Sequence, residues 1–149
     1  MAPKRDNLVN KVYFACSIRG GRDDADFYAD IVRVTKKYAT VLTEIFADKK
    51  LTSAGMDKPT GEIWSNDIRW IGQADAMIAE VTNPSLGVGY EIAKAEKMSK
   101  PVLCLFRENK GRKLSAMIDG SPSTSVFAYT DISTAEHAIA TFIANLSPR

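Results

Sequence analysis

The residues best suited to chemistry lie in the stretch from Glu80 to Glu91, which reads Glu-Val-Thr-Asn-Pro-Ser-Leu-Gly-Val-Gly-Tyr-Glu. It begins on an apolar run typical of a buried strand, turns at Asn83-Pro84 and predicts a helix from Ser85. Ligands bind at such junctions in open α/β sheets, because backbone N–H groups and the positive end of the helix converge there. Small residues let an anion approach the backbone, and Glu91 follows about two turns into the helix. The stretch therefore predicts a site for a phosphorylated substrate and a carboxylate that acts on it.

A second candidate anion site is the turn Ser17-Ile-Arg-Gly-Gly21, which directly follows the first apolar run of the chain. Its glycines free the backbone to wrap an anion, Ser17 offers a hydroxyl, and Arg19 can pair with two phosphate oxygens at once. The alternative is an ordinary polar turn between a strand and a helix. The turn is not a Walker loop, because no Gly-Lys-Ser/Thr follows it, and the later Gly-Val-Gly lacks the third small residue of a dinucleotide fingerprint. A nicotinamide dehydrogenase is therefore not indicated.

Asp67 is a candidate proton donor. It lies at helical spacing from a set of apolar residues: Ile63, Trp64, Trp70 and Ile71. This spacing puts the carboxylate on or beside a buried helix face, where partial burial raises its pKa toward a value useful for proton transfer. The alternative is an ion pair or a position at the edge of the helix.

Glu91 shares a helix face with small and apolar residues: Gly87, Val88 and Ala95. If Ser85 caps this helix, the capping-box position is Val88, so Glu91 is not there to cap. The alternative is a solvent-facing pair with Lys94. Two carboxylates on neighbouring helices are the minimum equipment for glycosidic chemistry. Tyr13 is a weaker candidate, because an aromatic residue in a core strand usually serves the core.

Composition narrows the class of protein. The 149 residues predict one domain at 11–149 after a short leader at 1–10, which lacks the apolar segment of a signal peptide. A net charge of +2 and the absence of a basic stripe argue against a nucleic-acid or membrane partner. Cys16 and Cys104 fall in apolar runs and predict buried thiols in a reducing compartment. The single histidine, His137, is expected at the surface and argues against a zinc site or a Ser-His-Asp triad.

The pattern along the chain alternates strand and helix. Apolar runs predict strands at residues 11–16, 40–43, 76–79, 101–106 and 126–129. Helical spacing predicts helices at residues 27–37, 60–72, 85–100, 114–118 and 135–146. This order predicts an α/β three-layer sandwich with a five-stranded parallel sheet, of the flavodoxin-like or Rossmann-like kind. The polar connection from Glu44 to Pro59 is long for a compact domain, and a lid over the site is one interpretation.

Several of these motifs together resemble one family. They are residues 12–21 (VYFACSIRGG), 41–44 (VLTE), 66–70 (NDIRW), 79–91 (AEVTNPSLGVGYE), 103–107 (LCLFR) and 114–118 (LSAMI). In this order they resemble the 2′-deoxynucleoside 5′-monophosphate N-hydrolases of the nucleoside 2-deoxyribosyltransferase superfamily. The resemblance covers about residues 11 to 130, and the motif around Glu91 is long enough to be specific.

The resemblance implies roles for individual residues. Glu91 matches the nucleophile that forms a covalent deoxyribosyl intermediate, and Asp67 matches the residue that protonates the departing base. Tyr13 matches the tyrosine that positions the nucleophile and disfavours a ribose 2′-hydroxyl. The 5′-phosphate is expected to be held by Cys16, Ser17, Ile18, Arg19, Gly20, Gly21, Arg22, Ser85 and Gly87. The segment Ser115, Ala116 and Met117 is expected to reach the active site of a second subunit, which implies a homodimer.

Two departures from the family pattern affect the expected site. Cys16 stands where the family has glycine before the phosphate-binding serine, and Ile45 stands where the family usually has histidine near the base. The base preference therefore stays open.

Three other functions remain as alternatives: a deoxyribosyltransferase, a ribonucleotide N-glycosidase acting on CMP-like substrates, and a non-catalytic nucleotide sensor. The favoured interpretation is a cytoplasmic or nuclear homodimer that hydrolyses deoxynucleoside monophosphates without a metal or organic cofactor.

Overall fold

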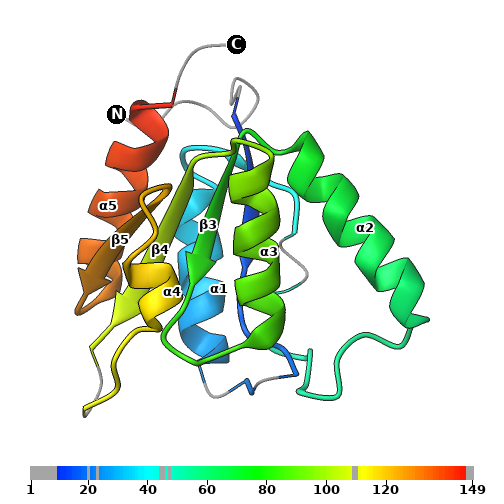
Figure 1. Ribbon diagram of the computed structural model, residues 1–149. Helices are drawn as coiled ribbons and strands as arrows, with labels where there is room; N and C mark the ends of the chain where they lie inside the picture. The colour runs from blue at the N-terminus through cyan, green and yellow to red at the C-terminus, as the bar shows by residue number, and fades with distance from the viewer. Residues whose placement is uncertain are drawn as a thin grey trace.

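The fold is a parallel sheet covered by helices on both faces, as the sequence predicts (Figure 1). The computed structural model describes residues 10–146 except 20, 23, 44, 45, 47, 109 and 110, so the expected leader at 1–10 lies almost entirely outside the described residues. The five strands are β1 (Lys11–Ala15), β2 (Thr40–Val41), β3 (Ala76–Glu80), β4 (Val102–Arg107) and β5 (Thr124–Tyr129). They lie in the order β2-β1-β3-β4-β5, with every neighbouring pair parallel.

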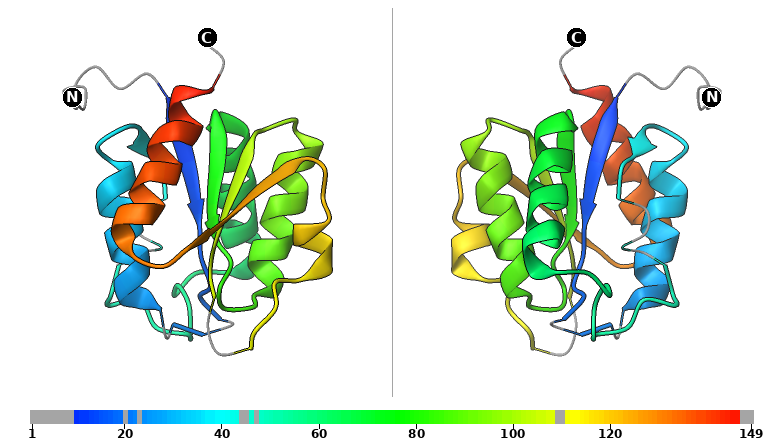
Figure 2. Two further views of the ribbon diagram at one scale, coloured as in Figure 1. Left: turned by 90° about the vertical axis from the view of Figure 1, so that its left-hand side faces the viewer. Right: turned by 90° about the vertical axis from the view of Figure 1, so that its right-hand side faces the viewer.

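Helices form the two outer layers. They are α1 (Ala25–Thr35), α2 (Thr60–Gln73), α3 (Leu86–Lys97), α4 (Ala116–Asp119) and α5 (Ile132–Ala144). Figure 2 shows α1 and α5 on one face of the sheet and α2 and α3 on the other. All residues of β3 are buried, because the central strand is covered on both faces.

The strand order places the candidate site. From β1 the chain first moves outward to β2 and then returns to build β3, β4 and β5 on the other side. The order therefore switches direction between β1 and β3, and a crevice forms outside the carboxyl ends of strands at such a point. The turn at residues 16–22 follows β1 and the stretch at residues 81–91 follows β3, so both candidate anion sites open into the same crevice.

Most predicted elements are present, with shifted ends. α5 starts at Ile132, earlier than expected, because Asp131 forms a capping box with Thr134. β5 starts at Thr124 instead of 126. The short helix α4 covers residues 116–119 instead of 114–118, because Ser115 is its N-cap.

β2 differs most from the prediction, since it contains two residues instead of the four expected at 40–43. Beyond it, the side chain of Thr43 takes over the pairing with β1. The Phe14 N–H donates to Thr43 Oγ1 at 2.8 Å, and the Thr43 hydroxyl donates to the Phe14 carbonyl at 2.7 Å. One buried hydroxyl thus satisfies both backbone groups of a residue next to Tyr13.

Other sequence predictions on burial are confirmed. Cys16 and Cys104 are buried free thiols, and His137 is exposed. Within the described residues, no helix has the length and apolar character needed to cross a bilayer.

We expect Thr43→Val to lower the free energy of unfolding by about 2–4 kcal/mol, because the buried Phe14 N–H and carbonyl both lose their partner while the side-chain shape is kept. Thr43→Ser keeps the hydroxyl and should cost clearly less. Urea unfolding of the two variants checks this, and equal losses would show that the hydroxyl bonds do not matter.

Candidate active site

A cavity of about 550 Å³ lies between α2, the start of α3 and the turn after β1. It contains both carboxylates singled out from the sequence, Asp67 from α2 and Glu91 from α3. The turn contributes Cys16, Ile18 and Arg19 to its wall. The two strand-to-helix junctions predicted from sequence therefore share one pocket.

Glu91 is held by Tyr13 at the inner end of this cavity. The Tyr13 side chain is fully buried in β1, and its hydroxyl donates a hydrogen bond to Glu91 Oε2. Burial raises the pKa of Glu91 to about 8, the hydrogen bond from Tyr13 opposes this, and the charge of Asp67 adds to it. Burial and the neighbouring Glu91 likewise raise the pKa of the Tyr13 phenol far above its usual range. Tyr13 therefore stays protonated and serves as a hydrogen-bond donor.

Asp67 lines the same cavity as Glu91 but comes from α2 instead of α3. Burial raises the pKa of Asp67 to about 6. Neither carboxylate forms an ion pair within the described part of the chain. The alternative pair of Glu91 with Lys94 does not form, because Lys94 Nζ lies over the rings of Trp64 and Tyr90. Two carboxyl groups with raised pKa values in one cavity can exchange roles as proton carrier and charged group.

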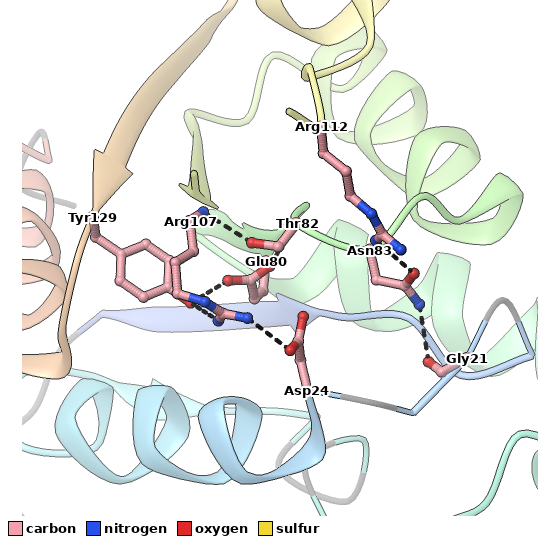
Figure 3. A network of polar contacts seen from close by, with 8 residues as sticks. All are labelled: Gly21, Asp24, Glu80, Thr82, Asn83, Arg107, Arg112 and Tyr129. Carbon is pink, nitrogen blue, oxygen red and sulfur yellow. Dashed lines mark hydrogen bonds and ion pairs between the residues drawn. The ribbon is translucent and has the colours of Figure 1, made fainter. Parts of the chain in front are cut away.

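The turn after β1 is shaped by Asn83, a residue that the sequence marked only as part of a turn. Asn83 Nδ2 donates to the Gly21 carbonyl at 3.3 Å (Figure 3). It also donates to Ser17 Oγ at 3.1 Å, so it joins both ends of the turn. Gly21 has a φ of 131°, and a Cβ there would lie 2.8 Å from Asn83 Nδ2. Glycine is therefore required at this position for both conformation and space. Arg112 donates to Asn83 Oδ1 at 3.4 Å and steadies the amide from the other side.

A buried polar network supports the strand ends behind this turn (Figure 3). Glu80 is fully buried, and it accepts hydrogen bonds from the Tyr129 hydroxyl and from the Thr82 N–H, the latter at 2.6 Å. Burial raises the pKa of Glu80 above its ordinary value. Next to it, Arg107 pairs with Asp24 at 2.7 Å, which anchors the start of α1 to the end of β4. The sequence offered one signal for this network, a glutamate at the end of an otherwise apolar strand.

Arg22, expected as a phosphate ligand, has its guanidinium turned toward the backbone. It donates to the carbonyls of Phe46 (2.8 Å), Asp48 (2.9 Å), Leu51 (2.9 Å) and Ser17 (3.2 Å). It is not among the residues that line the cavity. Arg22 therefore ties the connection after β2 to the turn after β1.

The connection expected at residues 44–59 contributes Phe46, Gly55 and Met56 to the cavity wall. Gly55 packs so closely on Arg19 that a Cβ there would lie 3.0 Å from Arg19 Nε. The connection thus covers part of the site, and a lid movement stays a prediction. Gly20 and Ile45 lie outside the described residues.

The remaining expected site residues fall into two groups. Ser85 and Gly87 line the cavity: Ser85 caps α3 by accepting from the Val88 N–H at 3.3 Å, and a Cβ at Gly87 would lie 3.9 Å from Glu91 Oε1. Ser115, Ala116 and Met117 are exposed on α4 and do not line the cavity of their own chain.

Cys16, one of the two departures from the family pattern, is accommodated in the wall of the cavity. Its thiol is buried and donates to the Phe46 carbonyl at 3.3 Å, while burial raises its pKa to about 12. The thiol is therefore neutral and serves packing.

Replacement of Glu91 by glutamine should stabilise the fold in a pH-dependent way. The pKa of Glu91 rises from an ordinary 4.5 to about 8 on folding, so the folded chain holds this proton more tightly than the unfolded chain does. The associated stability is complete below pH 4.5 and is lost as the pH rises through about 8. Because glutamine does not ionise, Glu91→Gln should exceed the wild type by about 2–4 kcal/mol at pH 8 and match it near pH 4.

Thermal or urea unfolding across this pH range measures the difference. Glu62→Gln is the matched control, since Glu62 is an exposed carboxylate on α2. A Glu91→Gln gain that does not grow with pH would contradict the buried position of the carboxyl.

Comparison with known proteins finds a matching family and several relatives of this chain. A family described as nucleoside 2-deoxyribosyltransferase matches residues 12–142. A protein of Rattus norvegicus named 5-hydroxymethyl-dUMP N-hydrolase is 46% identical over 138 residues, covering 91% of this chain and 85% of the relative. The Homo sapiens protein of the same name is 47% identical over 122 residues, covering 80% and 70%. A Trichoplax adhaerens relative, named putative 2′-deoxynucleoside 5′-phosphate N-hydrolase 1, is 46% identical over 127 residues, covering 85% and 87%.

Solved structures support the fold. The solution structure of BlsM superimposes with a TM-score of 0.70 at 20% identity, covering 93% of this chain and 92% of that one. The Clostridium botulinum CMP N-glycosidase BcmB gives a TM-score of 0.63 at 15% identity, covering 89% and 98%. The family match and the relatives above show that the chain belongs to the nucleoside 2-deoxyribosyltransferase family.

Proposed function

We propose that this protein hydrolyses the N-glycosidic bond of 2′-deoxynucleoside 5′-monophosphates, releasing a free base and 2-deoxyribose 5-phosphate. The observation that carries the proposal is the Glu91 carboxyl, held by the Tyr13 hydroxyl in a cavity that also contains Asp67. The names of relatives that share almost half of their residues with this chain point to the same reaction.

In the first step, the Glu91 carboxylate attacks the anomeric carbon of the sugar. The bond to the base breaks, its electron pair goes to the base nitrogen, and Asp67 supplies the proton that the base needs. The product of this step is a sugar ester of Glu91. A pKa of about 6 lets Asp67 carry that proton in a useful fraction of molecules near neutral pH.

In the second step, water replaces Glu91 on the sugar. The ionised Asp67 takes a proton from the water, the new C–O bond forms, and the ester bond breaks to regenerate the Glu91 carboxylate. The hydroxyl of Tyr13 donates to Glu91 when it is charged and so stabilises it both before attack and as a leaving group. The family resemblance gives Tyr13 a second role, to disfavour a ribose 2′-hydroxyl, and its contact with Glu91 supports a place beside the sugar.

The 5′-phosphate binds, in this proposal, between the turn after β1 and the start of α3. Arg19 supplies a positive charge at the wall of the cavity, and the capped N-terminus of α3 at Ser85 favours an anion. Gly87 keeps the path to the backbone open. Binding energy from the phosphate, which does not react, then serves to orient the sugar toward Glu91.

A deoxyribosyltransferase is the second candidate, because the matching family is described by that activity. It would use the same nucleophile but pass the sugar to a second base instead of water. Arg19 and the α3 N-terminus at the cavity wall favour a phosphorylated substrate, and hence hydrolysis of monophosphates over transfer between free nucleosides.

We further propose a homodimer in the cytoplasm or nucleus. Ser115, Ala116 and Met117 are exposed and away from their own cavity, which fits a role in the site of a partner. Met117 is 85% exposed and Leu86, at the cavity mouth, is 97% exposed, as expected for apolar residues that a second subunit covers.

The decisive assay is base release from a panel of deoxy- and ribonucleoside monophosphates, followed by chromatography. We expect release from the deoxy series, and we expect Glu91→Gln to abolish it while nucleotide affinity changes by less than about tenfold, because binding rests mainly on the phosphate. Glu62→Gln should keep full activity. Wild-type rates of base release in Glu91→Gln would refute Glu91 as the nucleophile. Formation of a new nucleotide after addition of a second base would indicate a transferase. Faster release from ribonucleotides would indicate a ribonucleotide N-glycosidase.

A subunit-mixing experiment tests the shared site. Ser115→Ala should weaken binding of monophosphates by about tenfold, because a hydrogen bond to a charged group is lost, and it should leave binding of the corresponding nucleosides unchanged. A heterodimer of Ser115→Ala with Glu91→Gln contains one site with Glu91 from one subunit and Ser115 from the other. Mixing the two variants should therefore restore activity at the wild-type KM. A fully active monomer in solution would contradict the dimer.

A further inference from the structure

An aromatic pair joins α2 and α3 at the edge of the cavity, and the mechanism above assigns it no role. Trp64 from α2 and Tyr90 from α3 both line the cavity, and they are 50% and 49% exposed. The indole N–H of Trp64 donates to the Tyr90 hydroxyl oxygen at 3.1 Å. Two large aromatic side chains thus keep much of their surface open beside a site for a planar molecule.

Lys94 fixes the arrangement of this pair. Its Nζ lies 5.5 Å from the centre of the Tyr90 ring and 6.0 Å from the centre of the Trp64 ring. A cation over an exposed aromatic ring contributes about 0.5–1 kcal/mol, which is similar to the net contribution of a hydrogen bond. The two contacts together favour one orientation of the indole.

Each member of the pair is close in sequence to one of the two carboxylates, Trp64 to Asp67 and Tyr90 to Glu91. Trp64 belongs to the face of α2 that lines the cavity, which consists of Thr60, Ile63, Trp64, Asp67 and Ile68. Residues three apart on a helix are neighbours, with about 5–6 Å between their Cβ atoms. Tyr90 directly precedes Glu91. A base that takes its proton from Asp67 must lie within hydrogen-bond distance of that residue, and a planar base there extends toward Trp64.

We propose that Trp64 binds the substrate's base by packing its indole against the face of that base, and that Tyr90 holds the indole in place by accepting a hydrogen bond from its N–H. The proposal rests on the proposed function, which puts the base next to Asp67. Stacking of a base on an aromatic side chain contributes about 1–3 kcal/mol and is open to every base, because each has a π face.

The rest of the wall around this position is apolar. It consists of Phe46, Met56, Ile63 and Ile68. Such a wall makes few hydrogen bonds to the edge of a base. The site therefore ranks bases by the area that they stack, and it tolerates substituents on the ring.

The test compares a ligand with a base and a ligand without one. In a Glu91→Gln background, which prevents turnover, titration calorimetry measures the Kd of dGMP and of 2-deoxyribose 5-phosphate. Trp64→Ala should weaken dGMP about 5- to 150-fold, as the loss of stacking implies. It should change the Kd of 2-deoxyribose 5-phosphate by less than about twofold, since that ligand has no base to stack. Trp64→Phe keeps a ring and should lose less.

Tyr90→Phe tests the hydrogen bond, because it removes the acceptor and keeps the ring. It should weaken dGMP when Trp64 is present and have no further effect in the Trp64→Ala background, as a double-mutant cycle requires. Equal weakening of both ligands, no effect on either, or a failure of dGMP to bind would overturn the proposal. Normal dGMP binding without base release by the wild-type protein would instead overturn the proposed function alone.

Discussion

The hydrogen bond from Tyr13 to Glu91 joins two residues that are 78 positions apart, and most of the site depends on it. It forms because β1 and β3 are direct neighbours in the sheet, so the end of β1 faces the helix that follows β3. The same neighbourhood brings the turn at residues 16–22 against α3. An insertion of another strand between β1 and β3 would separate Glu91 from its hydrogen-bond donor and both from the turn at residues 16–22. The order of the strands is therefore the constraint from which the chemistry follows.

Polar groups at the carboxyl ends of the strands then have to be satisfied without filling the crevice. Glu80 is fully buried and keeps hydrogen bonds from Tyr129 and Thr82, while Asn83 uses its amide to join Ser17 and Gly21. A buried polar group without partners costs about 1–3 kcal/mol of stability. Because this network supplies the partners, the crevice forms without that loss. On the cavity side of the turn lie Ile18 and Arg19, so the polar network supports the turn from behind without lining the cavity.

The sequence predicted what local patterns determine and missed what long-range contacts determine. The strand-turn-helix stretch ending at Glu91 and the burial of Asp67 follow from periodicity over a few residues, and both were predicted. The residue pattern alone makes Tyr13 a weaker candidate, because a core strand does not reveal its neighbours before the strand order is known, and it is the family resemblance that assigns Tyr13 a role. The role of Arg22 was equally hidden: its guanidinium meets carbonyls 24–29 residues later, because the connection after β2 folds back over the turn. The strand predicted at 40–43 is longer than β2. At Thr43 the side-chain hydroxyl takes the place of a backbone hydrogen-bond partner for β1, and the sequence pattern is the same for both arrangements.

The two carboxyl groups also explain why Tyr13 matters beyond positioning. Burial raises the pKa of both Glu91 and Asp67, so burial alone favours the protonated form of each. The proposed attack needs Glu91 ionised and Asp67 protonated. Positive charge that develops at the anomeric carbon favours an ionised Glu91, and the hydroxyl of Tyr13 stabilises the same state by a hydrogen bond. In the proposed mechanism the Tyr13 hydroxyl and the developing positive charge therefore offset the effect of burial on Glu91, while burial leaves Asp67 able to carry a proton for the base.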